Sequence, residues 1–190
     1  MSRSLVTLRD ATLADVEHLA ELWHPFLRRA ADEHLGDLAT AIERAADQPG
    51  ERLVVAEYDG SFAGAVFLRA ATYSPVNPEP VLQAHNPVVH PAYRKRGIGK
   101  ALVEAAVSWA EELGIGHVGT AAASGSREGN RFMARLALGP QAVLRMAPTH
   151  AVRAKLNAAR HPGSRQVTQV LAVRRSLRNN ARSVSQSTGG

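Results

Sequence analysis

The alternation of apolar and polar positions along the chain predicts three helices that each have one apolar face. Apolar residues recur at spacings of three and four between Leu13 and Leu27, the period of one face of a helix, and Pro25 is expected to break or kink it. Further helices are expected over 37–47 and, with the strongest amphipathic pattern, over 101–113. Each of these faces needs a partner surface on which to pack.

Shorter apolar runs predict the strands that supply this surface. The runs 53–56 and 62–68 are joined by a turn containing Asp59-Gly60, which is typical of a β-hairpin. Pro87 cannot donate a ladder hydrogen bond, so we expect a bulge or an opening where it interrupts its strand. Between these strands, the proline-rich segment 71–80 is expected to be an irregular surface loop. Strands are predicted over 5–9, 53–56, 62–68, 81–89, 117–123 and 141–147, with a helix over 127–138.

The order of these elements indicates an α+β fold with a mostly antiparallel sheet and helices packed on it. A chain of 190 residues has room for one domain and an appendage, and its composition, 45% hydrophobic and 21% charged, is that of a protein with a packed core. We therefore expect one domain over residues 1–150 and a separate C-terminal extension over 151–190.

Charge is distributed unevenly between these parts. Residues 1–128 contain 12 Lys and Arg against 17 Asp and Glu, whereas residues 129–190 contain 11 Lys and Arg and no carboxylate. Within the basic extension we expect a short helix near 152–159, a strand or helix over 166–178 and a mobile end after 179. The favoured interpretation is a solvated extension that folds against the acidic body or a second subunit of a homodimer. Nucleic acid is a less favoured partner, because the extension has no Phe, Tyr or Trp to stack on bases.

Several classes of protein are disfavoured by what the sequence lacks. Without cysteine there is no disulfide, Cys-ligated zinc, iron–sulfur cluster or thiol nucleophile. The histidines show no His-Glu-x-x-His spacing, so no metal site is predicted, and no Gly-x-Ser-x-Gly elbow indicates a serine hydrolase. No apolar run is long enough for a membrane span, so a soluble, cytoplasmic protein without a membrane partner is expected.

The sharpest chemical signal lies between residues 88 and 102, where a strand leads through a glycine-containing turn into a helix. Gly97 and Gly99 allow close approach of a ligand to the backbone, and the first amides of the helix have no intrahelical acceptor. Four cations flank the turn, namely Arg94, Lys95, Arg96 and Lys100. The combination predicts a site for the diphosphate of a nucleotide cofactor. Leu102 stands where a Rossmann fingerprint has its third glycine, and no P-loop motif is present.

On these residues the chain resembles the Gcn5-related N-acetyltransferase (GNAT) superfamily. Residues 94–99, Arg-Lys-Arg-Gly-Ile-Gly, match its Gln/Arg-x-x-Gly-x-Gly/Ala motif, and Val89-His90-Pro91 matches its lead-in. The resemblance implies a GNAT-like sheet with splayed central strands, here 81–89 and 117–123, and acetyl-CoA in the gap between them. It also implies which residues contact the cofactor: Val88, Val89, Arg94, Lys95, Arg96, Gly97, Ile98, Gly99, Lys100 and Ala101. Among these, the backbone of Val88 and Val89 would pair with the pantetheine arm and polarise the thioester carbonyl.

The catalytic acid and base are where the chain departs from the family. Gln83 stands at the position of the usual glutamate, and Met133 at that of the usual tyrosine. His85, two residues after Gln83 and so on the same strand face, is the nearest candidate base. Tyr73 is the candidate acid. For both His85 and Tyr73 the alternative is a structural or solvent-exposed residue.

Two functions follow from this mixture of matches and departures. The first is an acetyl-CoA-dependent N-acetyltransferase, in which the amine of a small molecule or a protein attacks the thioester directly. The second is a catalytically weak or inactive acetyltransferase-like binding protein, whose CoA site is regulatory or vestigial and whose basic extension engages a polyanion or partner protein. Measured turnover separates them.

Overall fold

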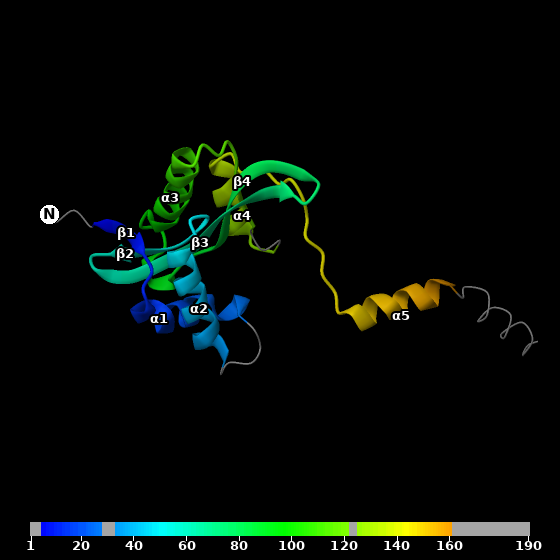
Figure 1. Ribbon diagram of the computed structural model, residues 1–190. Coiled ribbons are helices and arrows are strands. Elements are labelled where there is room, and N and C mark those ends of the chain that lie inside the picture. Colours follow the sequence, from blue (N-terminus) through cyan, green and yellow to red (C-terminus); the bar gives the residue numbers. More distant parts are fainter. Residues whose placement is uncertain (1–4, 28–32, 122–124, 161–190) are drawn as a thin grey trace, which may run out of the picture. The chain divides into compact units, whose positions relative to one another are not determined.

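The computed structural model describes residues 5–27, 33–121 and 125–160, and the chain divides into two units after Gly139 (Figure 1). Three 3-10 turns, Leu13–Asp15, His24–Phe26 and Pro91–Tyr93, link elements of the first unit. Its helices and strands are β1 (Val6–Asp10), α1 (Val16–Trp23), α2 (His34–Asp47), β2 (Glu51–Tyr58), β3 (Ser61–Ser74), β4 (Asn77–Val89), α3 (Ile98–Glu112), β5 (Val118–Thr120) and α4 (Arg127–Arg135).

The five strands form one sheet in the order β1-β2-β3-β4-β5, antiparallel except for the parallel pair β4 and β5. The predicted hairpin between β2 and β3 is confirmed. Its turn places Asp59 and Gly60 at φ 50° and 78°, the left-handed conformations that Asp-Gly adopts readily in a two-residue turn. The α+β class and the mostly antiparallel sheet are thus as the sequence predicts.

Helices cover both faces of this sheet, as Figure 1 shows. Helices α1 and α2 bury Leu19, Leu38 and Ile42 against one face, together with Leu53 and Val55 of β2 and Ala65 of β3. Helix α3 buries Leu102, Ala106 and Trp109 against the other. Because strand side chains alternate between faces, β2, β3 and β4 contribute to both cores. The expected break at Pro25 is confirmed, since α1 ends at Trp23 and a 3-10 turn follows.

Two sequence predictions are wrong. Residues 71–80 are not an irregular loop but belong to the ends of β3 and β4, which form a long hairpin. Its prolines are tolerated because β4 pairs with β5 only from Leu82 onward, so that Pro78 and Pro80 lie where β4 is an edge among the described strands. The expected strand 141–147 is irregular, with Val143, Leu144 and Met146 exposed. An apolar run becomes a strand only where a neighbouring strand completes its hydrogen bonds.

In the second unit, α5 (Thr149–Arg160) confirms the helix expected near 152–159. The expectations for 166–178 and for the end of the chain lie outside the described residues. None of the helices in the described part of the chain is both long and apolar enough to cross a membrane.

Candidate active site

The loop between β4 and α3 has the conformation of an anion cradle. After the 3-10 turn, Lys95 and Gly97 take the left-handed conformation, with φ of 62° and 86°, and α3 begins at Ile98. Ile98 is 1% exposed and fixes the start of the helix in the core. The side chains of Arg94, Lys95, Arg96 and Lys100 are exposed around this turn.

The backbone amides of this loop are available to a ligand. The first hydrogen bond of α3 runs from the Ala101 N–H to the Gly97 carbonyl, at 3.0 Å. Within the described part of the chain, the N–H groups of residues 95–100 donate to no protein acceptor. Orphan donors at the positive end of a fifteen-residue helix, next to four cations, fit a diphosphate group.

Two glycines have different functions near the loop. The positive φ at position 97 requires a glycine. At position 99 a Cβ would make only ordinary van der Waals contacts, at 3.5 Å from Phe132 and 3.6 Å from Val89. Gly64 on β3, which sequence reasoning missed, pairs with Val89, and a Cβ there would lie only 2.7 Å from the carbonyl oxygen of Val88. The available signal was an isolated glycine inside a strand, which often marks close approach of another backbone.

Arg96 ties the loop to the rest of the domain. Its guanidinium lies 4.8 Å from the centroid of the Tyr58 ring, at the end of β2, and 6.0 Å from that of Tyr93. Part of its positive charge therefore faces aromatic rings, a stabilising arrangement for a guanidinium. Among the four cations, Arg96 combines the predicted phosphate contact with a second function, that of holding the loop in place.

Beside the loop, β4 parts from β5. The two strands pair only between Leu82 and Ala84 on β4 and Val118 and Thr120 on β5, and the Thr120 hydroxyl donates to the Ala84 carbonyl at 2.8 Å. Beyond this point a bulge follows, and residues 85–89 of β4 have no β5 partner among the described residues. The bulge is the interruption that Pro87 predicts, and among the described strands the half-buried Val88 and Val89 lie on an edge of β4.

The bulge is held from the α1 side of the sheet. Asn86 adopts a positive φ of 47°, and the register between β3 and β4 shifts there. The indole N–H of Trp23, at the end of α1, donates to the Asn86 carbonyl at 3.0 Å. This hydrogen bond holds the bulge in β4 from the sheet face that α1 covers, which is the face opposite to α3.

His85 lies directly before the bulge. Its Nε2 is 3.2 Å from Oε1 of Gln83, and its ring lies 6.4 Å from that of Phe67, the opposite residue on β3. Partial burial lowers the pKa of His85 below its ordinary value of 6.5, and the positive charge of Arg69 lowers it further, against an opposing effect of Glu51. The imidazole is therefore neutral at pH 7.

Tyr73 lies far from His85. It is 58% exposed and stands six positions beyond Phe67 on β3, about 20 Å along the strand at the usual rise per residue. The structure thus brings His85 together with Gln83 and with the strand edge at Val88 and Val89, but not with Tyr73.

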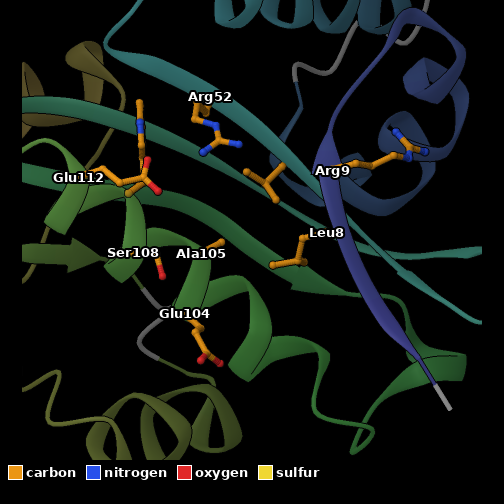
Figure 2. A pocket seen from close by; sticks show the side chains of 9 residues that line it. Leu8, Arg9, Arg52, Glu104, Ala105, Ser108 and Glu112 are labelled. Carbon is orange, nitrogen blue, oxygen red and sulfur yellow. The ribbon is translucent and has the colours of Figure 1, made fainter. Parts of the chain in front are cut away.

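A cavity of about 250 Å³ lies elsewhere, between β1, β2 and α3 on the opposite sheet face from His85 (Figure 2). In Figure 2, Leu8 points toward α3 while Arg9 points away, to its ion pairs with Asp15 and Glu57. The cavity is lined by Leu8, Arg9, Arg52, Val54, Glu104, Ala105, Ser108, Trp109 and Glu112. None of the predicted site residues is among them.

The fold and the loop together define an α+β domain in which a strand-to-helix turn with free amides and exposed cations is suited to a nucleotide-type cofactor. The family model of the acetyltransferase (GNAT) family matches residues 15–137, and the chain belongs to this family. Acetyltransferases of this family use acetyl-CoA. No curated protein sequence matches the chain.

Solved structures with the same fold include three of different description. The aminoglycoside N-acetyltransferase AAC(6')-Iy in complex with CoA has a TM-score of 0.64 and 18% identity, covering 78% of this chain and 97% of its own. A transcriptional regulator from Bacillus halodurans C-125 has a TM-score of 0.64 and 20% identity, covering 76% and 100%. A ribosomal-protein-alanine N-acetyltransferase from Brucella melitensis biovar Abortus 2308 has a TM-score of 0.57 and 21% identity, covering 76% and 99%. At these identities the likeness is one of fold.

Proposed function

We propose that this protein is an acetyl-CoA-dependent N-acetyltransferase in which the acceptor amine attacks the thioester directly. The observation that supports this most strongly is the set of free backbone amides over residues 95–100, surrounded by exposed cations at the start of α3. With its diphosphate bound there, acetyl-CoA would extend its pantetheine arm along the edge of β4 that has no partner among the described strands. When bound, acetyl-CoA supplies an acetyl group activated as a thioester.

The chain's own contribution to the chemistry begins with the backbone of β4. In the proposed complex, Val88 and Val89 pair with the pantetheine arm, and one of their amides donates to the thioester carbonyl oxygen. An amide held in place by a sheet stabilises negative charge on that oxygen without reorganisation. Gly64 supports this arrangement, because it allows β3 to approach Val88 closely on the other side.

We assign the base to His85, with Gln83 as the residue that orients it. In this proposal Nε2 of His85 carries the hydrogen and donates to Gln83 Oε1 at 3.2 Å, because an amide oxygen only accepts hydrogen bonds, and the lone pair of the neutral ring is then on Nδ1. A lowered pKa keeps this lone pair available at neutral pH. The glutamine at the family's glutamate position thus acts through its neighbour.

The acceptor is a primary amine of a small molecule or a protein. The neighbours named above include enzymes for both kinds of acceptor, an aminoglycoside and a ribosomal-protein alanine. Tyr73 is the predicted acid for the departing thiolate, but its position about 20 Å along β3 from the residue opposite His85 gives this role no support, so the thiolate takes its proton from solvent in this proposal. The binding-protein alternative rests on one observation, which is that Gln83 and Met133 cannot exchange protons as the family's glutamate and tyrosine do.

The experiment that tests this function follows release of free thiol from acetyl-CoA with a panel of amines, with mass spectrometry of the products. The proposal expects time-dependent thiol release together with an acceptor heavier by one acetyl group. If acetyl-CoA binds but no amine in the panel releases thiol above the protein-free rate, the binding-protein alternative holds.

A further inference from the structure

The sheet face around His85 carries charged side chains in the row next to it. Two rows of opposite residues cross it: Glu51, Arg69 and Gln83 form one, and Leu53, Phe67 and His85 the next. Directly opposite residues of an antiparallel pair share a face, so Arg69 lies on the same face as His85. The two are diagonal neighbours, with backbones about 7–8 Å apart in ordinary sheet geometry.

One carboxylate serves two guanidinium groups on this face. Glu51 contacts Nε of Arg44 at 2.6 Å and Nε of Arg69 at 3.5 Å, and its side chain is only 12% exposed. The side chains of Arg44 and Arg69 are 53% and 58% exposed. Arg44 also lies over the Phe67 ring, at 5.7 Å from its centroid. Both arginines contact Glu51 through Nε, and the outer nitrogens of both have no ion-pair partner in the described residues, but only Arg69 belongs to the row of strand residues next to His85.

We infer that Arg69 selects acceptors that carry a carboxylate close to the reacting amine, an inference that rests on the proposed function for the direction of the chemistry. The row of Glu51, Arg69 and Gln83 is directly beside the row of His85, so Arg69 is within reach of a substituent next to an amine that is presented to His85. A guanidinium matches a carboxylate in two parallel hydrogen bonds, which makes it selective for that group.

The same charges disfavour a polycationic acceptor. Recognition of several ammonium groups needs exposed carboxylates, whereas Glu51 is nearly buried and already shared by two arginines. A second cation placed beside the reacting amine would instead meet Arg69. The inferred acceptors are therefore amino acids or similar amino carboxylates rather than aminoglycosides.

Matched pairs of acceptors test this inference. Glycine, alanine and glutamate are compared with their α-amides in the thiol-release assay, for the wild type, Arg69→Gln and Arg69→Lys. The measured quantity is the ratio of kcat/KM between acid and amide. Comparing this ratio between variants cancels the intrinsic difference in amine basicity. Arg52→Gln removes the same charge from the opposite sheet face and is the control.

We expect Arg69→Gln to lower the acid-to-amide ratio by about tenfold or more, as for loss of a hydrogen bond to a charged group. Arg69→Lys gives an intermediate ratio, and Arg52→Gln leaves it unchanged. An equal ratio in the wild type and Arg69→Gln overturns the inference, as does a wild-type preference for amides or for an aminoglycoside probe. Circular dichroism checks that each variant is folded.

A binding readout separates this inference from the proposed function. Calorimetry of N-acetyl amino acids and their amides, with CoA present, needs no turnover. If thiol release fails but the acid still binds more tightly through Arg69, the acetyltransferase function is wrong and the carboxylate site stands. If thiol is released yet neither rates nor binding respond to Arg69, the carboxylate site is wrong and the function stands.

Discussion

At the residue scale, two neighbouring residues and partial burial affect the tautomer and the protonation state of His85. Gln83 determines which ring nitrogen carries the hydrogen, burial disfavours the charged ring, and Arg69 adds like charge nearby. Because the resulting pKa lies below 6.5, His85 accepts protons throughout the neutral range and loses this capacity only at acidic pH.

We predict that His85→Ala lowers the acetylation rate more at pH 7 than at pH 9. An acceptor amine with a pKa of about 10 is largely protonated at pH 7 and needs a base, whereas alkaline solution deprotonates it without help. The measurement is kcat/KM against pH for the wild type and His85→Ala. A constant ratio between the two across this range means that His85 is not the base.

Residue identities alone predict the strand-to-helix turn with its glycines and cations but not the surroundings of His85. The turn is local: Gly97, Gly99 and their cations are adjacent in sequence, and its conformation follows from them. The positions of Phe67 and Arg69 relative to His85 depend on the register between β3 and β4, which changes by one residue where Asn86 and Pro87 lie opposite the single residue Val66. Sequence patterning indicates that a bulge is present without giving the pairing on either side of it.

At the scale of elements, the connection between β1 and α1 depends on one buried carboxylate. Asp15 is 4% exposed, accepts two hydrogen bonds of 2.7 Å from Arg9 and one of 2.8 Å from the Thr12 N–H. The hydrogen bonds from Arg9 have the largest effect and hold the pKa of Asp15 below its ordinary value despite burial, and the smaller effect of the Thr12 N–H acts in the same direction. They join the end of β1 to the turn that precedes α1.

We predict that Asp15→Asn lowers the free energy of unfolding by about 2–4 kcal/mol at pH 7, because the Arg9 charge loses its closest partner. Since the lowered pKa stabilises the folded state only while the carboxylate is ionised, the difference is full above the unfolded pKa of about 3.9. It disappears as the pH falls through the folded value. Urea denaturation of the wild type and Asp15→Asn, at pH 7 and at an acidic pH where Asp15 is protonated in the folded state, measures this difference. The exposed pair of Asp10 with Arg52 provides the control, and Asp10→Asn should cost less than about 1 kcal/mol.

Gly64 offers a second test at the element scale. Gly64→Ala places a methyl group 2.7 Å from the Val88 carbonyl oxygen, so β3 and β4 must separate at the cofactor edge. We predict a loss of about 1–3 kcal/mol in unfolding free energy, together with weaker acetyl-CoA binding. Gly116→Ala is the matched control, because a Cβ there meets nothing within 4 Å. Equal stability of the two variants would show that the close approach is unimportant.

The two wrong element predictions share a cause. The prolines between 71 and 80 suggest a loop when the segment is considered alone, and the apolar residues of 141–147 suggest a strand. Whether a segment is extended in a sheet depends on a neighbouring strand that is distant in sequence. Helices, which complete their hydrogen bonds within themselves, were predicted more reliably, as α2, α3 and α5 show.

At the scale of the whole molecule, the two parts of the sequence carry opposite net charge, acidic over residues 1–128 and basic over residues 129–190. The family match ends at residue 137, before most of the acid-free region from 129 onward. In the described part of this region, Arg153 and Lys155 are exposed on α5 together with Val152 and Leu156. Association of this region with a second subunit or a polyanion stays a prediction. The loop over residues 94–100 belongs to the first unit, so the cofactor prediction is independent of it.

The central claim is that acetyl-CoA binds at the loop over residues 94–100, and calorimetric titration with acetyl-CoA tests it most directly. The loop variant is the double substitution Arg94→Glu and Lys100→Glu. The control, the α5 variant, is the double substitution Arg153→Glu and Lys155→Glu, which changes the net charge by the same amount. We predict that the loop variant weakens binding by about 3–6 kcal/mol, as two charge-assisted phosphate contacts would, while the α5 variant binds like the wild type. Equal affinity for the loop variant and the wild type, with both folded, would contradict the account.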